Sequence, residues 1–272
     1  MTDSLFDTKH EAVLRRDRLA VLTAVLLLIA LAWSYVLWLS LAMPDASMQG
    51  MDMRAMAPAI RPWTPTDLLF GVLMWTVMMA GMMLPSVVPV ILLYVLVGRQ
   101  AEALHKPLAA TGWFIGGYLL AWVGFSLLAA LLQAGLLQAA LLTPQLASAN
   151  DMLGGAILIA AGLYQWSPLK YKCLAKCRAP LFFIQRHGGF KPGAKNAVTL
   201  GFRHGLYCVG CCWALMLLLF VGGIMNVAWI AGLAVLVLAE KLWTHGPLLS
   251  RAVGIASIAG GLFLIVRDFA NW

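Results

Sequence analysis

The sequence predicts an all-α protein, a polytopic membrane helical bundle of about seven transmembrane helices. Hydrophobic residues make up 62% of the chain and charged residues 11%, and the mean hydropathy is +0.87. Such a composition cannot be folded around one aqueous core. The apolar residues also gather in segments long enough to cross about 30 Å of hydrocarbon at about 1.5 Å per residue.

The candidate spans cover residues 18–42, 68–98, 112–142, 152–169, 204–225, 227–243 and 251–268. The first follows Arg15, Arg16 and Arg18, and it is too long for the apolar part of a signal peptide, so we expect an anchor that stays attached. The second and third spans are longer than a bilayer needs, and the fourth and sixth are short. Tilting, kinking or partial re-entry would accommodate them.

The spans divide the chain into a cytoplasmic tail at 1–17 and a single transmembrane domain at 18–272. Within that domain we expect a methionine-rich outer loop at 43–67. A basic, cysteine-containing cytoplasmic loop should cover 170–203, with a short helix around 180–187. No internal repeat or separate soluble domain is evident.

The basic residues orient these spans, because short cytoplasmic loops are enriched in Lys and Arg. Sixteen of the nineteen fall on one side, and the other side holds Arg54, Arg61 and Arg267. The sequence therefore predicts a multi-pass membrane protein with a cytoplasmic N-terminus and a C-terminus on the outer side. The net charge of +8 then reflects this orientation and contact with the lipid bilayer, and it gives no indication of nucleic-acid binding.

All five cysteines lie within forty residues. Cys173 and Cys177 are four residues apart, as are Cys208 and Cys212, with Cys211 between the latter two. Four-residue spacing places two thiols on one face of a helix, so all five are expected to meet at one membrane depth near the cytoplasm. The cytosol disfavours disulfides, which leaves metal ligation, redox chemistry or plain burial. Nearby basic residues favour thiolates, which select monovalent copper or zinc.

Methionine forms a second pattern, with ten of the fourteen between residues 43 and 83. Thioethers suit monovalent copper in an oxidising outer compartment, where thiols would be lost. Methionine also serves as a flexible packing residue, so both roles stay open within the second span. The candidate ligands are Met48, Met51, Met53 and Met56 in the outer loop, and Met78 and Met82 in the second span.

Two further polar residues stand out near the cytoplasmic ends of spans. His204 precedes Cys208 by one helical turn and is a candidate added ligand. Glu240 is expected to pair with Lys241 or with an arginine of the basic loop; balancing a bound cation is the alternative. No P-loop is present, so no ATP binding is expected.

Four blocks of sequence resemble the bacterial predicted metal-binding integral membrane protein family, a domain of unknown function whose members are often labelled copper chaperones. They are WTVMMAGMMLP at 75–85, GLYQWSPLKYKCLAKCRAP at 162–180, GLYCVGCCWALM at 205–216 and AEK at 239–241. The resemblance covers about residues 66–250. It implies a polytopic inner-membrane protein whose five cysteines form a soft-metal site.

We interpret the chain as a soft-metal binding protein that acts in the transfer, transport or delivery of monovalent copper, with a metal-donor or metal-acceptor protein as partner. One alternative is a membrane thiol–disulfide oxidoreductase that uses the cytoplasmic cysteines. Against it, CVGC at 208–211 has redox spacing but no thioredoxin-like surroundings. The other alternative is a metal-responsive membrane scaffold. We expect binding rather than catalysis.

The unequal distribution of Lys and Arg between the two sides of the membrane predicts the topology directly. A reporter fused after Trp272 should report the periplasm, and one fused at Gly188 should report the cytoplasm. A phosphatase and a fluorescent protein, each active on one side only, make the measurement. Both fusions reporting the same side would contradict the assigned orientation.

Overall fold

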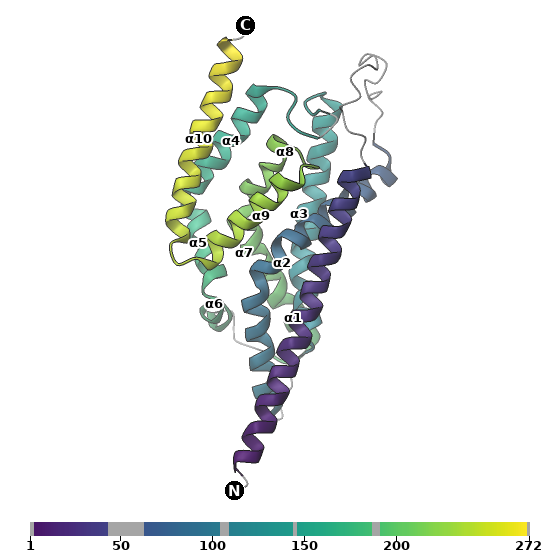
Figure 1. The fold of residues 1–272 in the computed structure, drawn as a ribbon, viewed down its shortest axis with the longest axis vertical. Helices are drawn as coiled ribbons and strands as arrows, with labels where there is room; N and C mark the ends of the chain where they lie inside the picture. Colours follow the sequence, from purple (N-terminus) through teal and green to yellow (C-terminus); the bar gives the residue numbers. More distant parts are fainter. Residues whose placement is uncertain (1–2, 43–62, 104–108, 144–145, 187–190, 271–272) are drawn as a thin grey trace.

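The computed structural model describes residues 3–42, 63–103, 109–143, 146–186 and 191–270, and within these ranges the chain is helical without a named strand (Figure 1). This confirms the all-α class. The helices are α1 Asp3–Ala42, α2 Pro65–Ala103, α3 Thr111–Gln138, α4 Asp151–Gln165, α5 Pro168–Arg178, α6 Pro180–Arg186, α7 Ala194–Leu217, α8 Leu219–Gly222, α9 Val227–Leu242 and α10 Gly246–Ala270.

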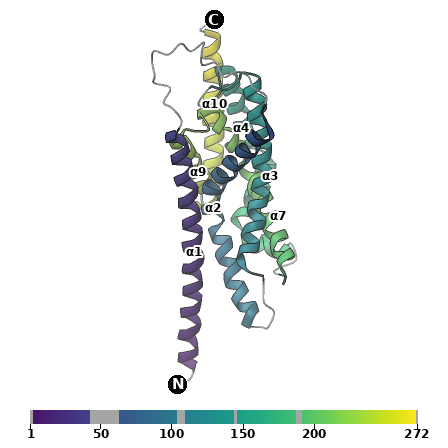
Figure 2. The same cartoon turned by 90° about the vertical axis from the view of Figure 1, so that its right-hand side faces the viewer.

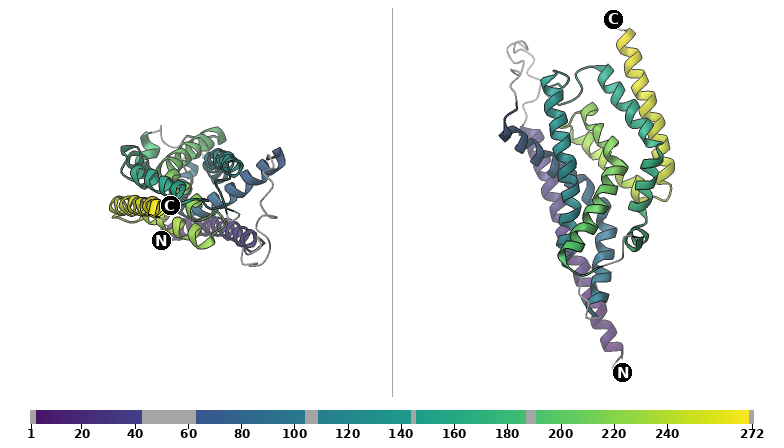
Figure 3. Two further views of the ribbon diagram at one scale, coloured as in Figure 1. Left: turned by 90° about the horizontal axis from the view of Figure 1, so that it is seen from above. Right: turned by 180° about the vertical axis from the view of Figure 1, so that it is seen from behind.

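The long helices run side by side and form an elongated bundle, with the two chain ends at its opposite extremes (Figure 1). The most extensive helix pairs are α3 with α7 and α4 with α10. Helix α1 packs mainly along α2 at one edge, and α10 lies beside α4 at the other (Figure 3). The short helix α9 lies between these edges and contacts α2, α5, α7 and α10.

Five helices of the described chain are long and apolar enough to cross a membrane, and six are if the bent pair α4 and α5 counts as one span. The expected count of seven is not confirmed. The predicted span 227–243 corresponds to α9, which has 16 residues and is therefore about 24 Å long, short of a hydrocarbon core. The predicted span 152–169 corresponds to α4, which ends at Gln165. These long apolar helices fit a multi-pass membrane protein.

A break between α4 and α5 turns the chain by 63°. Ser167 caps α5 by accepting a hydrogen bond from the Lys170 backbone N–H at 3.1 Å. Pro168 follows at the first helical position. A backbone N–H at this position has no acceptor within the helix, so proline costs no hydrogen bond there. Much of the expected loop at 170–203 is therefore helical, and α6 lies where the sequence predicts a short helix.

Helix α2 contains Pro85 and Pro89 and changes direction along its length (Figure 2). Proline removes a backbone donor and clashes with the preceding turn, which is the usual cause of such a bend. Four methionines just before the bend are buried, namely Met78, Met79, Met82 and Met83.

Glycines set the distance between α3 and α7. A Cβ added to Gly117 would clash with the Val198 carbonyl oxygen, and one added to Gly201 would clash with the Phe114 carbonyl oxygen. Backbones this close allow extensive van der Waals contact, which is a main source of helix association in lipid. Since α7 carries three cysteines, this packing fixes their position in the bundle.

Substitution of Gly117 tests this packing. Gly117→Ala should lower the free energy of unfolding by about 1–3 kcal/mol, because α3 and α7 must move apart. Gly116→Ala is the matched control, since nothing lies within 4 Å of a Cβ at that position. The control should be neutral or slightly stabilising. Thermal unfolding in detergent makes the comparison, and equal melting temperatures for the two variants would refute the close approach.

Candidate metal centre

The cysteines of α5 and α7 come together inside the bundle. All five are free thiols, and four of them are buried, with Cys177 half-buried. Helix α7 begins at Ala194 rather than at residue 204, so Cys208 lies well inside the helix, about 21 Å along its axis. The helix therefore extends well before the predicted span that begins at residue 204. The thiols of α7 lie within the apolar interior of the bundle.

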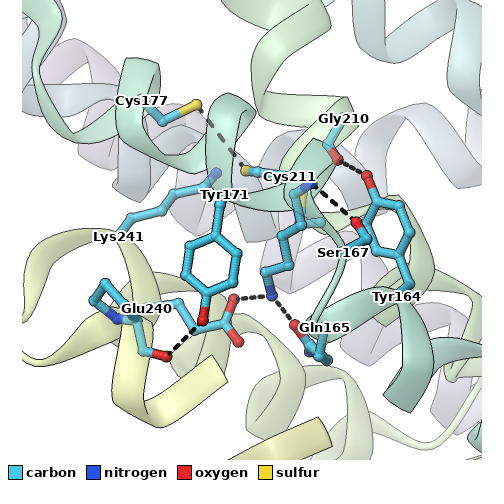
Figure 4. A network of polar contacts seen from close by, with 12 residues as sticks. Tyr164, Gln165, Ser167, Tyr171, Cys177, Gly210, Cys211, Glu240 and Lys241 are labelled. Atoms are coloured by element: carbon cyan, nitrogen blue, oxygen red, sulfur yellow. Dashed lines mark hydrogen bonds and ion pairs between the residues drawn. The ribbon is translucent and has the colours of Figure 1, made fainter. Parts of the chain in front are cut away.

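Cys177 and Cys211 form the first close pair. Their Sγ atoms are 4.0 Å apart and join α5 to α7 (Figure 4). The hydroxyl of Tyr164 on α4 donates a hydrogen bond to the carbonyl of Gly210 beside this pair. Helices α4, α5 and α7 therefore all fix the position of these sulfurs.

Cys208 and Cys212 face α2 and α3. The Cys212 Sγ lies 3.9 Å from the thioether sulfur of Met83 on α2. The Cys208 Sγ lies 3.1 Å from the hydroxyl of Tyr118 on α3. This second group therefore combines two thiols with a buried thioether that was not among the predicted ligands.

The backbone of α7 also organises the thiols. The carbonyl oxygen of Cys208 accepts hydrogen bonds from the Cys211 thiol at 3.1 Å and the Cys212 thiol at 2.9 Å. Such bonds to the preceding turn are typical of short polar side chains within helices. One carbonyl thus holds the thiols of both groups in position.

Lys241 reaches the same sulfurs from α9. Its Nζ lies 2.9 Å from the Cys208 Sγ, 3.9 Å from the Met83 Sδ and 3.0 Å from the Ser86 Oγ. The residue is only 6% exposed, and a lysine is rarely buried so deeply without a partner. The charge distribution alone places Lys241 among the sixteen basic residues of the predicted cytoplasmic side. Its adjacency to Cys208 in space leaves no signal in the sequence.

Glu240 forms a buried ion pair, but with Lys170 rather than with Lys241 or an arginine. The Lys170 Nζ lies 2.7 Å from the Glu240 Oε2 and also donates to the side-chain oxygen of Gln165 (Figure 4). The expected pairing with Lys241 is wrong because successive helical residues point in different directions. Arg178 contacts the Glu240 backbone carbonyl at 3.3 Å, not the carboxylate. The ion pair therefore joins α5 to α9.

The remaining predicted ligands are more dispersed. Cys173 packs against Gly210, where an added Cβ would lie 2.9 Å from its sulfur. His204 is buried beside the rings of Phe114 and Tyr118. Met78 and Met82 are buried on α2. The outer-loop methionines Met48, Met51, Met53 and Met56 lie outside the described residues.

The arrangement brings sulfur atoms together in pairs. Within the described part of the chain, no three Cys, His, Asp or Glu side chains are grouped closely enough to hold a metal ion. The pair separations of 4.0 Å and 3.9 Å nevertheless suit a shared soft ion. Two sulfurs bonded to one ion at about 2.3 Å stand roughly 3.8 Å apart in tetrahedral geometry and about 4.6 Å apart in linear geometry.

Residues 72–264 match the family PpoB2, which is described as a copper chaperone. The chain belongs to this family. The match confirms the resemblance seen in the sequence, and its range contains all five cysteines, Met83 and Lys241. The outer-loop methionines precede it. No curated protein and no solved structure matches the chain.

The buried ion pair makes a quantitative prediction about stability. Lys170→Met should cost about 3–5 kcal/mol of unfolding free energy, because it leaves the Glu240 carboxylate buried and uncompensated. Replacing both residues, as Lys170→Met with Glu240→Leu, should recover much of that loss. Thermal unfolding in detergent measures both.

The control for these substitutions of the buried pair is the more exposed ion pair between Arg267 and Asp151. Arg267→Met should cost no more than about 1 kcal/mol, because water screens that pair. A double variant of Lys170 and Glu240 that is no more stable than Lys170→Met alone would contradict the assigned pairing.

Proposed function

We propose that this chain binds monovalent copper through sulfur within a multi-pass bundle of the bacterial inner membrane and passes it to an acceptor protein. The observation that supports this most is the convergence of thiols from α5 and α7 with a thioether from α2 in a buried, apolar setting. Soft sulfur ligands favour monovalent copper over harder ions. The family description agrees with this role.

A row of methionines on α2, buried except for the partly buried Met74, supports a path for the ion. Met74, Met78 and Met82 repeat every four residues and so lie along one face of the helix, while Met79 and Met83 follow beside it. From Met74 to Met83 the helix rises about 13 Å. With the proposed orientation, the outer-loop methionines would capture copper and this row would lead it to Cys212.

Copper fits the centre better than zinc does. Structural zinc sites take four tetrahedral ligands, and catalytic sites keep three from the protein. Two sulfur pairs, Cys177 with Cys211 and Cys212 with Met83, approach to 4.0 Å and 3.9 Å, which is sufficient for a monovalent copper ion that accepts few soft ligands. Pairs at two neighbouring positions also let an ion move by exchanging one sulfur at a time.

The thiol–disulfide oxidoreductase remains the second candidate. The separation of 4.0 Å between the Cys177 and Cys211 sulfurs favours it, because a modest movement would bring them to the bonding distance of about 2.05 Å. An enzyme of this kind would exchange electrons through that pair. It would need neither Met83 nor copper.

Metal binding by purified protein tests the proposal. Under anaerobic conditions the wild type should bind monovalent copper, and X-ray absorption should show sulfur neighbours. Cys212→Ser and Met83→Leu should each weaken copper binding by at least about 10- to 100-fold. Altering a residue that only supports a metal ligand already lowers metal affinity by about this factor, and these two side chains are proposed as ligands themselves. Met152→Leu, at an exposed position on α4, is the matched control and should bind as the wild type does.

Two outcomes would overturn the copper function. Nitrogen and oxygen neighbours alone in the absorption spectrum would rule out the sulfur centre. A mixed disulfide trapped with a substrate protein, with copper binding unaffected by Cys212→Ser, would favour the oxidoreductase.

A further inference from the structure

The ammonium group of Lys241 is a fixed positive charge among soft metal ligands. Its nearest sulfur is the Cys208 Sγ at 2.9 Å. Among the described residues no carboxylate pairs with it, since the adjacent Glu240 is engaged by Lys170. The charge of Lys241 is thus directed at the sulfurs themselves.

We propose that Lys241 makes the sulfur centre selective for monovalent over divalent soft cations, an inference that rests on the proposed metal binding. An ion held between Cys212 and Met83 would lie close to the Lys241 ammonium, which is 3.9 Å from the Met83 sulfur. The repulsion between the two cations grows in proportion to the charge of the ion. A divalent ion therefore experiences twice the repulsion of a monovalent one.

The charge balance of the centre leads to the same selectivity. Lys241 and one monovalent ion carry two positive charges, which the thiolates of Cys208 and Cys212 neutralise. A divalent ion raises the total to three, and Met83 is neutral, so a third buried thiol such as Cys211 must also lose its hydrogen or one charge stays unbalanced. Burial of an unbalanced charge is strongly unfavourable.

Ser86 keeps this charge in place when an ion binds. Its hydroxyl oxygen accepts a hydrogen bond from the Lys241 Nζ at 3.0 Å, independently of the cysteines. The ammonium therefore retains a partner when Cys208 or Cys212 turns toward a metal. Electrostatic selectivity requires such a charge, one that remains beside the bound ion.

The test compares silver(I) with cadmium(II), two soft ions of the same electron configuration that differ in charge. Their dissociation constants are measured by competition with a chelator on wild type, Lys241→Met and Lys241→Arg. The ratio of silver to cadmium affinity should fall by about tenfold or more in Lys241→Met, since a unit charge at these distances is worth more than the 1.4 kcal/mol of a tenfold change. Lys241→Arg should retain the wild-type preference.

Lys176→Met is the matched control, because it removes a lysine charge that lies over the Tyr207 ring instead of at the sulfurs of Cys208, Cys212 and Met83. It should leave the ratio unchanged. An unchanged ratio in Lys241→Met would overturn the inference while leaving metal binding intact. If Lys241→Met does not fold, the affinities of the wild type for the two ions are compared instead. Cadmium binding as tight as silver binding would equally overturn the role of Lys241. A wild type that binds neither ion would instead overturn the metal-binding function.

Discussion

The ion pair between Lys170 and Glu240 links the two segments on which the sulfur centre depends. Lys170 belongs to α5, which carries Cys173 and Cys177, and Glu240 belongs to α9. Because Glu240 and Lys241 are successive residues, anchoring the first toward α5 turns the second toward α2 and α7. A single buried contact therefore positions a thiol-bearing helix and also directs an ammonium group at the cysteines. Isolated buried pairs often contribute little net stability relative to apolar residues of the same shape.

The sequence was sufficient for the helical class and the family, because hydrophobic length and short motif blocks are local properties of the chain. It was not sufficient for the number of spans. Helix α9 reads as a span by hydropathy, yet it is too short and lies between other helices. The break at Ser167 was also missed, although a serine followed by a proline is a common start of a helix.

Side-chain partners were the least predictable part of the centre. Met83 appeared as one methionine among five on α2, and only the packing of α2 on α7 brings it to Cys212. Lys241 appeared as one of sixteen basic residues that orient the protein in the membrane. Its burial depends on how α9 packs, which is a long-range property of the fold. Glu240 was recognised as unusual, since carboxylates are rare in apolar segments, but its partner lies seventy residues away in the chain.

The carbonyl oxygen of Cys208 gives the centre a further property. It accepts hydrogen bonds from two thiols of its own helix, and both bonds require the sulfur to carry a hydrogen. A thiol that becomes a metal ligand loses that hydrogen. Loading the centre would therefore release protons inside the bundle and free the Cys208 carbonyl from its two donors, while unloading would require protons to return. Exchange of the ion with a partner would then be accompanied by proton movement through the buried part of the bundle.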